Sequence, residues 1–332
     1  MGMKLDEIAK LAGVSRTTVS YVINGKAKKY RVSDRTIEKV KSVIKQYDFK
    51  PNIMAAGLRA GKTYSIGLII PDLENTSYAK IANLLESKFR ERGYQLLITC
   101  TNDNSDIELQ CAKHLIQRQV DALIVSSVLP AENHFYDEYS GMPIFGFDRY
   151  LAGKNIINVL GDDEHDAQLL ADNLFSKQTH GKILFLSALS SLPVSRAREM
   201  GFNQALDEYP DLDAEYLYVE QFNKSFAKSA VGNWLENNEL PPAIFCTSLT
   251  LLQGFLQALL DRLGEVPKSL MIATFGNHEM LEILGNPVVC MVQDYQKIVQ
   301  TLINLSLNEL EDRQLGSDTN SIQRKVVYHH YD

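Results

Sequence analysis

The sequence predicts an α/β protein with a helical N-terminal segment and a larger body of two doubly wound parallel sheets. Three observations support this prediction. Residues 1–50 show only helical periodicity, whereas from residue 64 onward short, almost continuous apolar runs alternate with helical patterns. Such runs are typical of a parallel sheet covered on both faces. The alternation starts afresh near residue 182, which predicts a second lobe of the same kind.

The strands of this fold are expected at the apolar runs themselves. In the first lobe the runs are residues 64–70, 94–100, 121–127 and 143–147. In the second lobe they are residues 182–188, 214–220, 243–248 and 270–276. Two later runs, 288–294 and 324–331, are expected to cross back between the lobes.

Charge is divided unevenly along the 332 residues, whose formal net charge is −7. Residues 1–62 hold 14 Lys and Arg against 5 Asp and Glu, whereas the rest of the chain holds 20 against 36. A basic segment ahead of an acidic body is expected when the first contacts phosphates and the second has another task. The alternative is a solvated basic tail.

Three short helices are expected in the basic segment. Leu5, Ile8, Ala9 and Ala12 recur with helical spacing, and the pattern ends at Gly13, which suits a turn with positive φ. A second helix capped by Ser15 and a third capped by Ser33 or Asp34 would turn inward Val19, Val22, Ile23, Ile37, Val40, Ile44 and Tyr47. The tight turn between the first two helices makes this a helix-turn-helix unit.

The second helix leaves polar side chains exposed near its N-terminus, the end that enters the DNA major groove in such units. These candidate DNA-binding residues are Ser15, Arg16, Thr17, Ser20, Tyr21 and Asn24. Arg16 can make a bidentate contact to guanine, worth about 1–3 kcal/mol of base discrimination. The basic residues that follow, Lys26, Lys28, Lys29 and Arg31, are expected to add phosphate contacts. For the second helix, the alternative is an ordinary polar surface helix. For the basic residues that follow it, the alternative is a mobile loop.

These residues resemble the N-terminal signature of the lactose/galactose repressor family of bacterial transcription regulators. The match lies at Ala9, Ala12-Gly13-Val14-Ser15, Thr18-Val19-Ser20 and Ile23-Asn24, although residues 25–31 are longer and more basic than is usual there. The resemblance implies a DNA-binding domain in residues 1–50, a hinge helix in 51–62 and a body of the periplasmic-binding-protein-like fold in 63–332. We expect a first lobe of about 63–162 plus a C-terminal crossing, and a second lobe of about 163–291.

The hinge segment 51–62 is too short and too weakly apolar to form a stable helix alone. The resemblance implies that two copies of it pair in the minor groove of the operator. Leu58 would wedge between bases at the centre, with Ala55 and Arg59 also contacting DNA. The alternative is a plain linker with Leu58 packed on the body.

Ligands of doubly wound folds bind at the carboxyl ends of the strands, here in the crevice between the lobes. The candidate effector-binding residues that follow the predicted strands are Asp72, Asn75, Asp148, Arg149, Arg196, Phe222, Thr247, Ser248, Gly276, Asn277 and Gln293. For each residue alone, the alternative is a helix cap or a surface ion pair.

Two departures from the family point to an anionic effector. Ser248-Leu249 stands where many sugar-binding members carry an Asn-Asp pair, and Gly276-Asn277 where they carry an acid. Fewer carboxylates beside Arg149 and Arg196 favour a phosphate, which guanidinium and hydroxyl donors recognise. Residues 65–78 and 272–281 resemble members that respond to fructose phosphates, which implies fructose 1-phosphate as effector, fructose 1,6-bisphosphate as a weaker one, and control of carbon metabolism genes. The alternative is a different sugar or sugar phosphate, or a co-repressor.

The sequence favours a regulator over an enzyme, because it has no GxGxxG after a strand, no P-loop, no GxSxG and no HExxH. No cofactor or metal is expected: the four cysteines form no CxxC, and the adjacent His329 and His330 would point to opposite faces of a strand.

The partners expected are operator DNA, a sugar phosphate and a second copy of the chain. Two heads would read half-sites of a pseudo-palindrome as a homodimer, with a tetramer left open. No apolar run reaches the roughly 18 residues of a membrane span. The start is charged, unlike a signal peptide, so we expect a cytoplasmic protein and not a periplasmic sugar-binding protein.

Overall fold

A computed structural model describes residues 3–49, 62–311 and 320–331 of the chain. The chain divides into two compact units, Met1–Thr63 and Tyr64–Asp332. Each unit has hydrophobic clusters of its own. Within the described residues, no helix is both long and apolar enough to cross a membrane.

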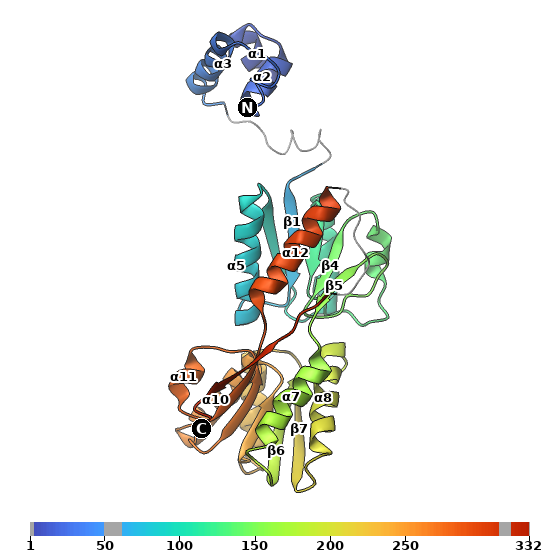
Figure 1. Cartoon of the computed structure of the whole chain (residues 1–332), viewed down its shortest axis with the longest axis vertical. Coiled ribbons are helices and arrows are strands. Elements are labelled where there is room, and N and C mark those ends of the chain that lie inside the picture. The colour runs from blue at the N-terminus through green and yellow to red at the C-terminus, as the bar shows by residue number, and fades with distance from the viewer. Residues whose placement is uncertain (1–2, 50–61, 312–319, 332) are drawn as a thin grey trace. The chain divides into compact units, whose positions relative to one another are not determined.

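The N-terminal unit consists of three helices, α1 (Leu5–Ala12), α2 (Arg16–Ile23) and α3 (Asp34–Gln46) (Figure 1). Gly13 ends α1 with a left-handed φ of 61°, a conformation that glycine adopts without strain. Ser15 caps α2 by accepting a hydrogen bond from Thr18 N, and Ser33 caps α3 by accepting one from Thr36 N. These caps fix where both helices begin.

The core of this unit is built from the predicted apolar stripes, with one correction. Ile8, Ala12, Val19 and Val40 are fully buried. Tyr47, predicted to face inward, is 43% exposed. Helix α3 ends at Gln46, so Tyr47 lies at its cap and leaves the helical phase.

The basic segment between α2 and α3 is a packed turn. Val32 N donates to the Ala27 carbonyl, and Ala27 is only 5% exposed. The ring of Tyr30 stacks on Tyr21 with centroids 3.9 Å apart. Hydrogen bonds and stacking therefore hold Lys26, Lys28, Lys29 and Arg31 in place on the surface of the unit.

The first lobe of the body is a six-stranded parallel sheet in the order β11-β5-β4-β3-β1-β2. Its strands are β1 (Ser65–Ile70), β2 (Gln95–Cys100), β3 (Ala122–Val125), β4 (Ile144–Phe147), β5 (Ile157–Leu160) and β11 (Asn320–Ser321). Its helices are α5 (Thr76–Glu91), α6 (Ser105–Gln117), the 3₁₀ helix η1 (Phe135–Tyr139) and α12 (Tyr295–Leu310). Strands β5 and β11 are additional to those the sequence predicts.

The second lobe is a six-stranded sheet in the order β12-β10-β9-β8-β6-β7, in which only β12 is antiparallel to its neighbour. Its strands are β6 (Gly181–Ala188), β7 (Leu212–Val219), β8 (Ala243–Cys246), β9 (Met271–Phe275), β10 (Val288–Val292) and β12 (Lys325–His329). Its helices are α7 (Asp163–Phe175), α8 (Pro193–Leu206), α9 (Lys224–Trp234), α10 (Leu249–Leu263) and α11 (Met280–Leu284).

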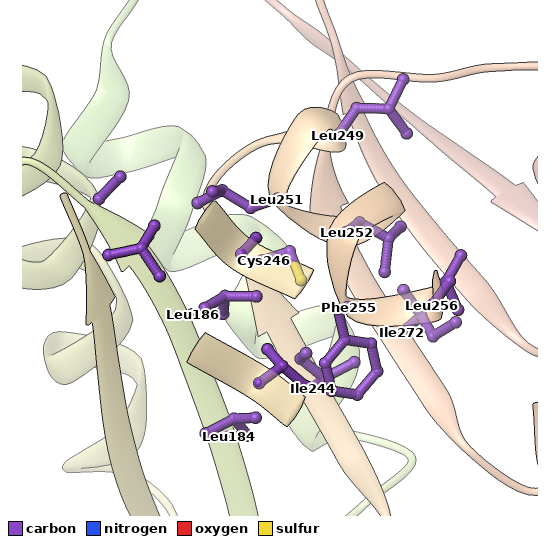
Figure 2. Packing of buried hydrophobic residues seen from close by; sticks show 14 of the residues in the cluster. Leu184, Leu186, Ile244, Cys246, Leu249, Leu251, Leu252, Phe255, Leu256 and Ile272 are labelled. Atoms are coloured by element: carbon purple, nitrogen blue, oxygen red, sulfur yellow. The ribbon is translucent and has the colours of Figure 1, made fainter. Parts of the chain in front are cut away.

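Buried strands hold each lobe together. In the second lobe, Leu186, Ile244 and Cys246 on the sheet pack against Leu252 and Phe255 of α10 (Figure 2). All five are 0% exposed, and burial of a large apolar side chain contributes about 1.5–3 kcal/mol. This packing fixes the ends of the strands from which the crevice is built.

The described chain passes between the lobes at three places: residues 160–163, 292–295 and 321–325. The last of these is the dark red segment between the lobes in Figure 1. Because these passes lie beside the ends of β5 and β10, they carry side chains into the crevice.

Candidate functional site

A cavity lies between the two lobes at the carboxyl ends of several strands. Its volume is about 60 Å³, room for a few water molecules. Seven of the predicted effector-binding residues line it: Asn75, Asp148, Arg149, Phe222, Ser248, Gly276 and Gln293. The strand-end rule therefore locates the cavity.

Four other predicted residues are not among those that line it. Arg196 is exposed on the outside of α8. Asp72 accepts a hydrogen bond from Asn75 N, and the Thr247 hydroxyl is buried against Ser187 and the Leu186 carbonyl. Asn277 pairs with His329 at 2.9 Å.

Sequence reasoning missed four polar residues of the cavity, Ser77, Tyr78, Arg198 and Arg324. Arg198 lies on the same helix as Arg196 but on its buried face. Arg324 lies on the last pass between the lobes, only one residue before β12. The sequence signal that could have identified Arg324 is its position at the start of the run 324–331, which was expected to cross between the lobes.

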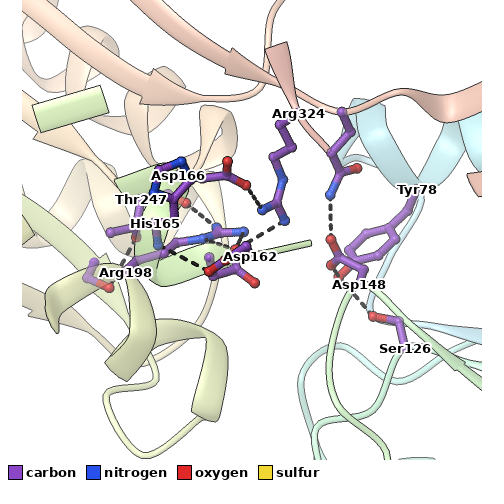
Figure 3. A network of polar contacts seen from close by, with 12 residues as sticks. Tyr78, Ser126, Asp148, Asp162, His165, Asp166, Arg198, Thr247 and Arg324 are labelled. Atoms are coloured by element: carbon purple, nitrogen blue, oxygen red, sulfur yellow. Dashed lines mark hydrogen bonds and ion pairs between the residues drawn. The ribbon is translucent and has the colours of Figure 1, made fainter. Parts of the chain in front are cut away.

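Asp148 is an ionised acceptor in the wall of the cavity. Its carboxylate accepts hydrogen bonds from the Tyr78 hydroxyl at 2.7 Å and from Gln293 Nε2 at 2.6 Å (Figure 3). Burial alone would raise the pKa of Asp148, but the charge of Arg198 and the Tyr78 hydrogen bond outweigh it, so the pKa is lowered. A sugar hydroxyl could donate to this carboxylate.

Arg198 and Arg324 form one buried ion-pair network with the first turn of α7. Arg198 Nε donates to Asp163 Oδ1 at 2.8 Å, and its Nη1 donates to the Thr247 carbonyl (Figure 3). Arg324 contacts Asp166 Oδ2 at 2.6 Å and Asp163 Oδ1 at 3.1 Å. Both guanidinium groups are therefore held in fixed orientations at the cavity.

The close packing of α7 on α8 makes the Arg198–Asp163 pair possible. A Cβ at Gly201 would overlap the Glu164 carbonyl oxygen. Glycine at this position lets the two helix backbones approach.

Arg149 is the third buried cation. Its Nη1 lies 2.6 Å from Asp103 Oδ1, and its guanidinium lies 5.4 Å from the Phe222 ring centroid. Burial would lower the pKa of Arg149, but the neighbouring Tyr78 and Asp103 raise it above its ordinary value. The cavity thus presents three guanidinium groups and an ionised carboxylate, a set suited to an anionic polyhydroxy ligand.

The described residues hold no cluster of three His, Cys, Asp or Glu side chains that could bind a metal ion. His329 and His330 contact different groups, Asn277 and the Glu282 carbonyl.

The predicted DNA-binding residues lie on and beside α2. Arg16 and Thr17 are exposed. Arg16 is 3.3 Å from Asp6, with both side chains about half exposed. Such surface pairs are weak, so Arg16 can exchange this partner for a base.

The other predicted contacts on α2 already have partners. Ser15 Oγ caps α2 by accepting a hydrogen bond from Thr18 N, so it already has a partner within the helix. Asn24 Nδ2 donates to Ser20 Oγ at 3.2 Å, and Tyr21 stacks on Tyr30. Ala55, Leu58 and Arg59 lie outside the described residues.

Comparison with known proteins agrees with both units. Residues 4–52 match the model of bacterial regulatory proteins of the lacI family, and residues 66–314 match a periplasmic binding protein domain. The catabolite repressor/activator of Salmonella typhimurium strain LT2 is 49% identical over 93% of both chains. The fructose operon regulatory protein of Vibrio cholerae is 42% identical over 98% of this chain and 99% of its own.

A solved structure is similar over most of the chain. It is the Cra transcriptional dual regulator of Pseudomonas putida in complex with fructose 1-phosphate, with a TM-score of 0.74 and 33% identity. The match covers 80% of this chain and 98% of that chain. These relatives are regulators, which confirms the prediction that the chain is not an enzyme. With a helix-turn-helix unit, two parallel-sheet lobes and these relatives, the chain belongs to the lacI family of DNA-binding transcription regulators.

Proposed function

We propose that this regulator controls carbon metabolism genes and is released from its operator by a sugar phosphate, fructose 1-phosphate being the first candidate. The observation that supports this most strongly is the set of three buried guanidinium groups beside Asp148 at the carboxyl ends of the strands. A 33% identical protein has been solved in complex with that sugar phosphate.

Arg149, Arg198 and Arg324 are the donors for the phosphate, and Asp148 is the acceptor for sugar hydroxyls. A cavity of about 60 Å³ holds a few waters but not a sugar phosphate. The lobes must therefore shift when effector binds. Such a shift links the crevice to the DNA-binding unit, and by thermodynamic linkage DNA must weaken effector binding by the same factor.

On DNA, the chain acts as a homodimer whose two helix-turn-helix units read the half-sites of a pseudo-palindrome. The α2 residues and the basic turn contact the half-site, and Leu58 with Ala55 and Arg59 contacts its centre. Acting on the bacterial chromosome, the protein works in the cytoplasm.

The test of this function is operator binding at several salt concentrations, with an operator selected from random-sequence DNA. Titration with fructose 1-phosphate should release the DNA at a lower concentration than fructose 1,6-bisphosphate, and free fructose should not release it. Salt must be varied because phosphate contacts make affinity depend strongly on it. Tight binding that no sugar phosphate disturbs would exclude this effector class, while release by free fructose would exclude the phosphate requirement.

Arg16→Ala should lower affinity for the selected operator about tenfold or more while changing non-specific affinity little, because a guanine contact discriminates by about 1–3 kcal/mol. The measurement is a gel shift with operator and scrambled DNA. Arg35→Ala, which removes another exposed arginine from the same unit, is the control and should affect both DNAs alike. An equal loss on both DNAs for Arg16→Ala would make Arg16 a phosphate contact.

A further inference from the structure

Asp103 bridges the two lobes at the edge of the cavity. It lies in the loop between β2 and α6 of the first lobe, and its side chain is 4% exposed. Its Oδ1 accepts a hydrogen bond from Arg149 Nη1 at 2.6 Å. Its Oδ2 accepts one from the backbone N–H of Phe222, on the second lobe, at 3.1 Å. One carboxylate thus occupies a donor from each lobe.

The two donors that Asp103 occupies are of the kind that binds phosphate. A guanidinium group and a backbone N–H that point at a common position form a typical anion site. Arg149 and Phe222 also line the cavity where the effector is proposed to bind. The Asp103 carboxylate therefore lies where two oxygens of a phosphate would be bound.

The charges around the cavity leave little room for an added anion. Three guanidinium groups, those of Arg149, Arg198 and Arg324, face the four carboxylates of Asp103, Asp148, Asp163 and Asp166. A phosphate group that carries about −1.5 to −2 charges would enter a buried site that already has one carboxylate in excess. Such a site binds the phosphate group tightly only if one of the carboxylates separates from the guanidinium group with which it pairs.

Asp103 is the carboxylate best placed to leave. Asp163 and Asp166 lie in the first turn of α7, and Asp163 contacts two arginines. Asp148 accepts from Tyr78 and Gln293. Asp103 pairs with a single guanidinium and lies on a loop.

We propose that Asp103 is a built-in counter-anion, which the phosphate of the effector displaces from Arg149 and from the Phe222 N–H. This inference rests on the proposed function. It makes Asp103 a specificity residue: the phosphate gains only the difference between its own contacts and those that Asp103 gives up. The charge of Asp103 therefore sets how strongly anions bind.

The test is Asp103→Asn in the full chain. Asparagine keeps an oxygen for the Phe222 N–H, removes the charge, and tolerates the left-handed φ of 54° at this position. Calorimetry in a phosphate-free buffer would measure binding of inorganic phosphate, fructose 1-phosphate and fructose. Both phosphates should bind about tenfold tighter to the variant, the scale of one charge-assisted hydrogen bond, with no change for fructose.

The matched control is Asp106→Asn, which removes the same charge from an exposed position three residues along the chain. It should leave all three affinities unchanged. Asp103→Ser provides a second uncharged variant, and operator binding by each variant reports that it is folded.

Three results would overturn the proposal. Weaker or equal phosphate binding by both uncharged variants would mean that Asp103 only positions Arg149. An equal gain for fructose and fructose 1-phosphate would mean that the charge is not what discriminates. If no sugar phosphate binds to the wild type or to either variant, the proposed effector class fails as well, whereas in the first two cases that class stands.

Discussion

Arg198→Met should abolish measurable binding of fructose 1-phosphate and lower the free energy of unfolding of the body by about 3–5 kcal/mol. The substitution leaves Asp163 with Arg324 as its remaining cation and removes the donor to the Thr247 carbonyl. The cost is this large because Arg324 alone would then face both Asp163 and Asp166, so that one buried carboxylate lacks a compensating charge. Methionine keeps part of the packing on Phe275, whose ring centroid lies 4.0 Å from the guanidinium carbon.

The loss is measured by urea unfolding followed through Trp234, the one tryptophan of the chain, and by calorimetry with the sugar phosphate. Arg196→Met is a matched control two residues away, because Arg196 is exposed and does not line the cavity. It should change neither quantity. Effector binding lost in Arg196→Met but kept in Arg198→Met would reverse the assignment of the two arginines.

The contrast between Arg196 and Arg198 shows which features of the site the sequence could predict and which it could not. A strand end followed by a helix start locates the segment that borders the crevice. Which residues near the start of α8 face the crevice depends on the phase of this helix, which begins at Pro193. That phase is set by packing on α7, so it could not be deduced from the strand pattern.

The need for a clear periodic pattern also explains which other elements and residues were predicted and which were missed. The long buried strands such as β1 and β6 were predictable, because both of their faces are covered and their residues are almost all apolar. Strand β11 has only two residues, too few to show a period. Arg324 lies in the segment that connects β11 to β12 between the lobes. This segment has no periodic pattern that would predict which of its side chains face the cavity.

Removing the Glu108 carboxyl should lower the stability of the first lobe. Glu108 of α6 is fully buried and accepts hydrogen bonds from Ser127 Oγ at 2.7 Å, Val128 N at 2.6 Å and the Tyr136 hydroxyl at 3.1 Å. Val128 packs into the hydrophobic cluster of the second lobe. Glu108→Ala leaves a buried N–H without its acceptor and opens a cavity, at a cost of about 3 kcal/mol in the free energy of unfolding. Because Val128 would lose its anchor, effector affinity should fall too.

Glu108→Gln is the informative partner variant, since an amide can accept from Val128 N and donate to the two hydroxyls. Burial raises the pKa of Glu108 above its ordinary 4.5, although its hydrogen bonds oppose the shift. Folding therefore favours the protonated carboxyl, and the wild type should lose stability relative to Glu108→Gln as the pH rises from about 4.5 through the folded-state pKa. Urea unfolding of both proteins between about pH 4 and pH 8, followed by circular dichroism, measures this difference. A difference that shrinks as the pH rises would mean that the folded lobe favours the carboxylate, so that the hydrogen bonds outweigh burial.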